Sequence, residues 1–154
     1  MNDSPQNSIW GPELWMILHS AAERVGSHVN KRLPQEEERI WYGLLGSLRY
    51  SLPCPQCKKH YASYFSSHRL VFGKDALRAW LFHLHQEVNQ RTSKEPFLFE
   101  RVQEQYRTPF HYSKHWHVVQ GQMILALRKG WCSREDIQRT ARFLEELKRF
   151  YDFF

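Results

Sequence analysis

Cysteine is scarce in this sequence, with three residues in 154. A small secreted scaffold held together by disulfides needs more, so that class is excluded and a reducing compartment is favoured. Glycine and proline are also few, with seven of each, which argues against a β-sandwich or β-barrel. No apolar run approaches the roughly 18 residues of a membrane span. The polar stretch 1–9 resembles no secretory signal, and we expect it to be flexible. The sequence therefore predicts a cytoplasmic protein without a membrane segment.

Aromatic residues are abundant by contrast, with six Trp, seven Tyr and ten Phe. The length suits one domain with a substantial core. The net charge of +6 is interpreted as a solvated basic surface or, alternatively, as a site for the phosphates of a nucleotide cofactor. Nucleic-acid binding is not expected, because the basic residues are scattered rather than gathered in one stripe.

Apolar residues recur at helical spacings of three and four along most of the chain. The pattern predicts a helix from Pro12 to Gly26, and a second that opens at Pro34 and stops before Leu52. A third helix is expected from the cysteine pair to about residue 68, and a fourth over about 74–91.

The remaining third of the chain is predicted to be helical too. A short helix is expected after Pro96, then a connector over 107–113 and a long helix closed by Gly130. Ser133 with Asp136 resembles a capping box that opens a last helix. No alternating strand pattern is present. The prediction is an all-α fold, a four-helix bundle with a short fifth helix and a helical C-terminal extension over 107–154.

The motif Cys54-Pro55-Gln56-Cys57 carries the chemistry. Pro55 suits the first position of a helix, so both cysteines fall on its opening turn, where the helix dipole favours the reactive thiolate. Residues three apart on a helix lie about 5–6 Å apart, within the range that a disulfide can close. We therefore expect a redox-active pair.

Two further pairs, Trp15 with His19 and His85 with Asn89, are spaced to share a helical face. Each alone is typical of an ordinary helix. Together with the cysteines and the aromatic residues they favour a pocket for an aromatic ring cofactor, with Lys94 available for its phosphates.

These motifs, in this order, resemble the Erv/ALR family of FAD-linked sulfhydryl oxidases. Trp15-Met16-Ile17-Leu18-His19 is similar to its W-x-x-L-H, residues 54–57 to its C-x-x-C, residues 80–89 to its W-x-x-x-x-H-N-x-V-N, and Lys94 with Phe97 to its K-x-x-F. The resemblance covers about 10–106. Trp-Gly-Pro ahead of the first motif, at 10–12, is similar to the virus-encoded branch.

The resemblance implies an FAD-binding four-helix bundle over 10–106 that oxidises protein dithiols to disulfides and passes the electrons to O2, giving H2O2. It implies a homodimer. Cys54 and Cys57 would be catalytic, with Cys57 next to the flavin and Cys54 exchanging with the substrate. The expected FAD-binding residues are Gly11, Trp15, His19, His85, Val88, Asn89, Lys94, Phe97 and Tyr106.

Several positions depart from the family pattern. Gln86 replaces an Asn, and Phe99 stands where many members have a structural cysteine. Residues 23–26 replace an aromatic-proline pair, and the separate shuttle C-x-x-C is absent. Cys132 is interpreted as a small buried apolar residue or, alternatively, as a shuttle thiol or intermolecular bridge.

Two other functions stay open. A thioredoxin-like protein without flavin would need a βαβ pattern around the motif, which is missing. A non-flavin helical interaction or zinc-binding module would have to combine the cysteine pair and His60 with one histidine of the loose group at 111, 115 and 117. Because that group is not a tight pair of ligands on one element, no metal is expected.

Overall fold

The computed structural model describes residues 4–27 and 34–154, and the described residues form seven helices and no strand. The all-α prediction is therefore confirmed. The helices are α1 (Asn7–Ala22), α2 (Pro34–Ser51), α3 (Pro55–Ser67), α4 (Lys74–Arg91), α5 (Glu100–Tyr106), α6 (Tyr112–Arg128) and α7 (Arg134–Phe150).

Local sequence signals determine the starts of α2, α3 and α7. Pro55 occupies the first turn of α3 behind the N-cap residue Cys54. The Ser133 hydroxyl oxygen accepts a hydrogen bond from the Asp136 amide at 3.1 Å, so the predicted cap of α7 is confirmed. Pro34 opens α2, also as predicted.

The ends of α1 differ from the prediction. The helix begins at Asn7 and contains Pro12, which was expected to open it. A proline removes only one backbone donor, and the helix continues through this loss. At the other end, α1 stops at Ala22, and a turn follows up to Gly26, whose φ of 84° suits glycine.

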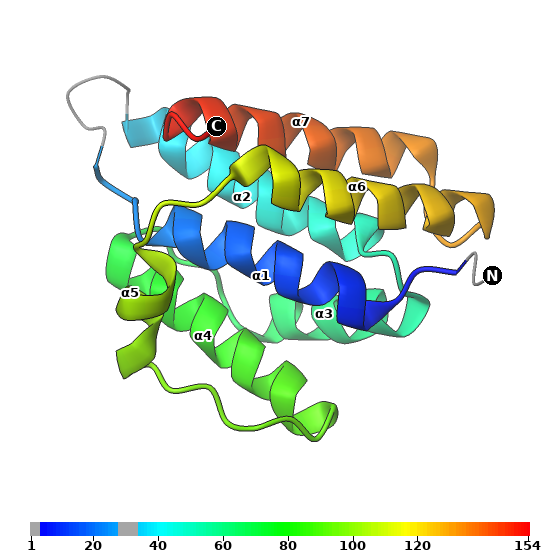
Figure 1. Cartoon of the computed structure of the whole chain (residues 1–154), viewed down its shortest axis with the longest axis horizontal. Helices are drawn as coiled ribbons and strands as arrows, with labels where there is room; N and C mark the ends of the chain where they lie inside the picture. The colour runs from blue at the N-terminus through cyan, green and yellow to red at the C-terminus, as the bar shows by residue number, and fades with distance from the viewer. Residues whose placement is uncertain (1–3, 28–33) are drawn as a thin grey trace.

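The helices are arranged on the two sides of α1 and α2. Helix α6 packs along α1 and α7 along α2, while α3, α4 and α5 lie on the other side (Figure 1). The core between these layers is fully buried and includes Trp41, Leu44, Leu45, Leu81 and Leu144. No helix among the described residues combines the length and apolar character needed to cross a membrane.

Candidate active site

The two cysteines of the C-x-x-C motif lie at the start of α3, and both are half-buried. Cys54 has an extended backbone (φ −163°) and acts as the N-cap, so its sulfur accepts a hydrogen bond from the Cys57 amide at 3.2 Å. This bond stabilises negative charge on Cys54, at the helix end where the dipole also favours it.

The two thiols share a proton unequally. The hydrogen bond that the Cys57 thiol donates to the Cys54 sulfur lowers the pKa of Cys54 to about 6 and raises the pKa of Cys57 above its ordinary value. Hydrogen bonding by the Asn7 side chain lowers the pKa of both thiols. In the reduced pair the anion therefore sits on Cys54 and the proton on Cys57 near neutral pH.

The turn between α6 and α7 packs against the segment that precedes Cys54. The Leu52 carbonyl accepts from the Cys54 amide at 2.8 Å and from the Cys132 thiol at 3.3 Å. The Lys58 ammonium donates to the Trp131 carbonyl. Cys132 is buried, and this burial raises the pKa of its thiol, as expected for a small apolar residue.

Trp15 and His19 of α1 form a continuous stack with His85 of α4. The rings of Trp15 and His85 are 4.1 Å apart and within 6° of parallel. Nε2 of His19 lies 2.9 Å from Nδ1 of His85, so one histidine donates to the other. Burial lowers the pKa of His19 to about 3 and that of His85 to about 4, which keeps both rings neutral at pH 7.

A cavity of about 680 Å³ lies beside the cysteine pair. Its volume is within the range of cofactor sites, roughly 300–1,000 Å³. Trp10 also lines the cavity. Among the described residues, its indole nitrogen is the one buried side-chain nitrogen or oxygen that has no hydrogen-bond partner. A buried donor without a partner is costly, and a bound group with an acceptor would relieve the cost.

The segment after α4 closes one wall of this cavity. The Asn89 side chain donates to the Glu95 carbonyl at 3.2 Å, and the Lys94 amide donates to the Asn89 carbonyl at 2.8 Å. The Phe97 amide donates to the Gln86 side-chain oxygen at 2.6 Å. These bonds hold the Phe97 ring 4.4 Å from the ring of His85. The amide of Gln86 thus has a structural partner in the chain itself.

The structure brings all the predicted site residues to one place. The cavity is lined by Cys54, Cys57, Gly11, Trp15, His85, Val88, Asn89, Lys94, Phe97 and Tyr106. His19 stacks against Tyr106 at 4.6 Å behind this wall. Sequence reasoning missed several other lining residues, among them Asn7, Trp10 and Arg91. Trp10 belongs to the Trp-Gly-Pro motif, whereas the only sequence signal of the other two is position: Asn7 lies one helical turn before Trp10, and Arg91 follows Asn89 by two residues.

A family model matches residues 12–107, which include the cysteine pair, α2 to α5 and nearly all of the lining residues. The chain belongs to the Erv1/Alr family. The predicted resemblance is therefore confirmed, and the family match ends just before α6.

Two viral proteins illustrate the similarity of this Erv1/Alr chain to known relatives. It is 31% identical over 91 residues to the mimivirus protein named "Probable FAD-linked sulfhydryl oxidase R368" from Acanthamoeba polyphaga mimivirus, covering 56% of this chain and 60% of that one. It is 31% identical over 87 residues to an FAD-linked sulfhydryl oxidase of African swine fever virus (isolate Pig/Kenya/KEN-50/1950), covering 56% and 70%. The chain thus spans somewhat more than half of the mimivirus relative. No solved structure matches it.

Proposed function

We propose that the protein is an FAD-dependent thiol oxidase that makes disulfides in protein dithiols, with O2 as the electron acceptor and H2O2 as the product. The main observation in support is that the half-buried Cys54–Cys57 pair lies on the wall of an aromatic cavity of about 680 Å³. Family membership and the names of the viral relatives support the same chemistry.

The residues of the cavity fit FAD. Trp15, His85 and Phe97 supply flat walls for aromatic rings, and the indole nitrogen of Trp10 offers an unused donor. Lys94 and Arg91 offer cations for phosphate groups. The chemistry that FAD supplies when bound is acceptance of two electrons from the reduced cysteine pair and their delivery to oxygen.

The protein contributes an ordered exchange of thiols. A substrate thiolate attacks Cys54 of the Cys54–Cys57 disulfide, which gives a mixed disulfide and frees the Cys57 thiolate. The second substrate thiol resolves the mixed disulfide, so the substrate leaves oxidised and the pair is left reduced. The N-cap position stabilises Cys54 as a leaving thiolate, with its pKa lowered to about 6. Reoxidation requires the Cys57 thiol to lose its proton, and the Cys54 thiolate, to which that thiol donates a hydrogen bond, is positioned to accept it.

Visible absorption of the purified protein tests this proposal, because bound flavin is yellow. Cys57→Ser should abolish dithiol oxidation while the protein keeps its colour, and Cys132→Ser should keep both. A folded wild-type protein that neither contains nor takes up FAD would contradict the proposal.

We also propose that the protein acts as a homodimer in the cytoplasm. The family resemblance supports the dimer, and the scarcity of cysteine suits a reducing compartment. Sedimentation at micromolar concentration tests the dimer, which a purely monomeric protein would contradict.

A further inference from the structure

Helix α5 forms part of the cavity wall but has little apolar surface to hold it. Of its seven residues only Val102 and Tyr106 are buried, and no side chain caps its N-terminus. Tyr106 nonetheless lines the cavity and stacks on His19 with a ring separation of 4.6 Å. A helix this short is not stable on its own, so other contacts must fix its position.

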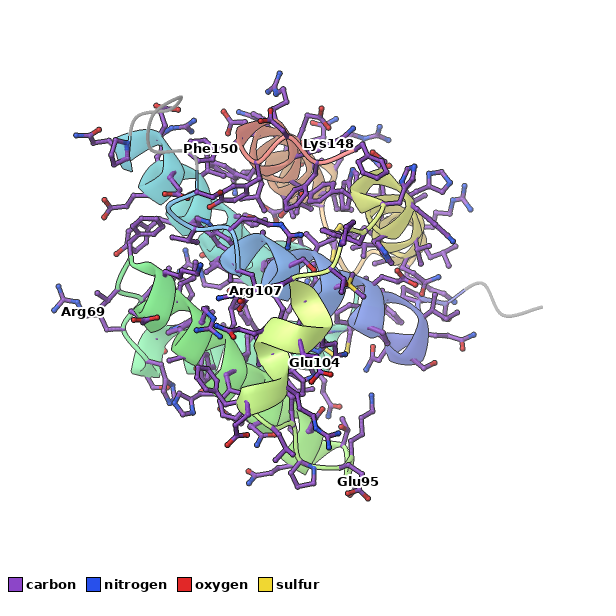
Figure 2. The ribbon with its side chains drawn as sticks, turned by 60° about the vertical axis from the view of Figure 1, so that its left-hand side comes forward. Arg69, Glu95, Glu104, Arg107, Lys148 and Phe150 are labelled. Carbon is purple, nitrogen blue, oxygen red and sulfur yellow. The ribbon has the colours of Figure 1, made fainter. Side chains whose placement is uncertain are left out.

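A buried carboxylate provides the first of these contacts. The Glu23 side chain is 1% exposed, and each of its oxygens accepts from a different arginine. Nε of Arg78 on α4 lies 2.6 Å from Oε2, and Nε of Arg107, directly after α5, lies 2.8 Å from Oε1. Figure 2 shows Arg107 at the end of α5, close to α1. Glu23 therefore ties the end of α1 to both α4 and α5.

Arg24 provides the second contact. Its guanidinium donates to the Ser20 carbonyl on α1 at 2.7 Å and to the Tyr106 carbonyl at 2.8 Å. It also donates to the carbonyls of Arg107 and Thr108 at 3.4 and 3.3 Å. The last carbonyls of a helix lack partners within the helix, and a cation is favoured there by the dipole. Arg24 thus caps α5 from the turn that follows α1.

The same group of residues also reaches the other end of α5. The Arg78 guanidinium lies 5.2 Å from the ring centre of Phe99, the N-cap residue of α5. We call Glu23, Arg24, Arg78 and Arg107 the Glu23 cluster. It contacts α5 at its start through Phe99 and at its end through the carbonyl of the cavity-lining Tyr106.

We propose that the Glu23 cluster holds α5 closed over the cavity and so controls how slowly the cofactor leaves. Its members are positioning residues that act through Tyr106, since Arg24, Arg78 and Arg107 are not among the cavity-lining residues. The proposal rests on the function given above, because it assumes that FAD occupies the cavity. It assigns a role to residues 23 and 24, which replace the aromatic-proline pair of the family pattern.

Arg107→Gln is the most suitable test, because the Arg107 side chain is 47% exposed and its replacement leaves no gap in the core. Glu23 still has Arg78 as a partner in this variant. Loss of one charge-assisted hydrogen bond to α5 should speed FAD release about tenfold. Amide hydrogen exchange over α5 in the FAD-free protein should quicken by a similar factor. The reaction of Cys54 with a small disulfide reagent should not change. Cys54 lies near Asn7 at the start of α1, whereas the cluster lies at the end of α1.

Arg39→Gln is the matched control. Arg39 also bridges two carboxylates, those of Glu36 and Glu146 at 3.0 Å each, but on the exposed side of α2. FAD release from this variant should stay within about twofold of the wild type.

The outcomes separate the two proposals. Equal FAD release from the Arg107→Gln and Arg39→Gln proteins would overturn the role of the cluster, and so would unchanged exchange over α5. A wild-type protein that takes up no FAD would contradict the proposed function instead, while exchange in the FAD-free variants would still show whether the cluster holds α5.

Discussion

The two sides of the α1–α2 layer differ in what they leave unfilled. Against α6 and α7, which we call the hairpin side, buried polar groups find partners within the chain: the Trp41 indole donates to the Tyr151 hydroxyl at 3.0 Å, and that hydroxyl donates to the Glu37 carboxylate at 2.5 Å. On the cavity side, the Trp10 indole nitrogen has no partner among the described residues, and the space amounts to about 680 Å³. The cavity and the donor without a partner thus lie on the same side of the layer.

This difference separates folding from binding. A filled, hydrogen-bonded interface contributes to the free energy of folding, whereas an open pocket with unused donors can bind a ligand. Substitutions on the hairpin side should therefore change stability, and those on the cavity side should change cofactor affinity. The predictions below test this division.

Leu144→Ala should have the largest effect. Leu144 of α7 is fully buried, so its truncation leaves a cavity and should lower the free energy of unfolding by about 3 kcal/mol. Urea unfolding of the FAD-free protein measures this loss. The exposed Ile124 of α6 is the control, and Ile124→Ala should cost less than about 0.5 kcal/mol. If the Leu144→Ala protein lost FAD while it remained folded, the division between the two sides would be contradicted.

Trp15→Leu should have the converse effect. It keeps an apolar side chain but removes the flat ring that stacks 4.1 Å from His85 on the cavity wall. FAD affinity should fall about 30-fold, equivalent to about 2 kcal/mol, while stability of the FAD-free protein changes by less. Fluorescence titration with FAD measures the affinity. Phe143 of α7 is an aromatic residue packed against the core on the hairpin side, so Phe143→Leu is the matched control and should bind FAD as the wild type does. Unchanged affinity in Trp15→Leu would place the cofactor elsewhere.

The cavity side should also make stability depend on pH. The pKa values of His19 and His85 are lowered to about 3 and about 4 in the folded protein, below the ordinary 6.5. The unfolded chain therefore takes up protons first as the pH falls. Stability is full well above pH 6.5 and decreases below it, by about 2 kcal/mol for the two rings together at about pH 5.8 and further toward pH 4. Urea unfolding at several pH values measures the slope, and His85→Gln should reduce it. If stability depended on pH equally steeply in the His85→Gln protein, the dependence could not be assigned to His85.

The sequence predicted the helices well where an end has a local chemical cause. Proline fixed the starts of α2 and α3, and Ser133 fixed the start of α7. The predicted start of α1 was wrong, because a proline often opens a helix but Pro12 lies inside this one. The cavity residues were predicted from motif order, which records the positions of lining side chains even when they come from different helices.

Contacts between distant segments were beyond the sequence. Nothing in its spacing indicates that the Phe97 amide donates to Gln86, or that residues 23 and 24 hold the end of α5. Such pairs depend on how the helices cross, and the periodicity of one helix carries no information about its partner. Asn7 was missed for the same reason, since its effect on the cysteines depends on where α1 passes α3.

Tyr151→Phe should have a smaller effect on the hairpin side. It removes the hydroxyl that accepts from the Trp41 indole and donates to Glu37, and should cost about 1–2 kcal/mol of stability because two buried groups lose a partner. Tyr42→Phe is the control, since Tyr42 is exposed and its hydroxyl donates to the Leu70 carbonyl at 3.0 Å. Thermal unfolding compares the two. Equal losses would mean that the buried network is no stronger than a surface bond.

Cys132 joins the two sides, and its substitution should have the smallest effect. Its thiol, on the turn between α6 and α7, donates to the Leu52 carbonyl that also accepts from the Cys54 amide. Cys132→Ala removes this donor and should cost about 1 kcal/mol, whereas Cys132→Ser keeps a donor and should cost less. Both variants lack the thiol, so turnover of a protein dithiol distinguishes structure from chemistry. Equal loss of turnover in both would assign Cys132 to electron transfer, and loss in Ala alone would assign it to holding the segment before Cys54.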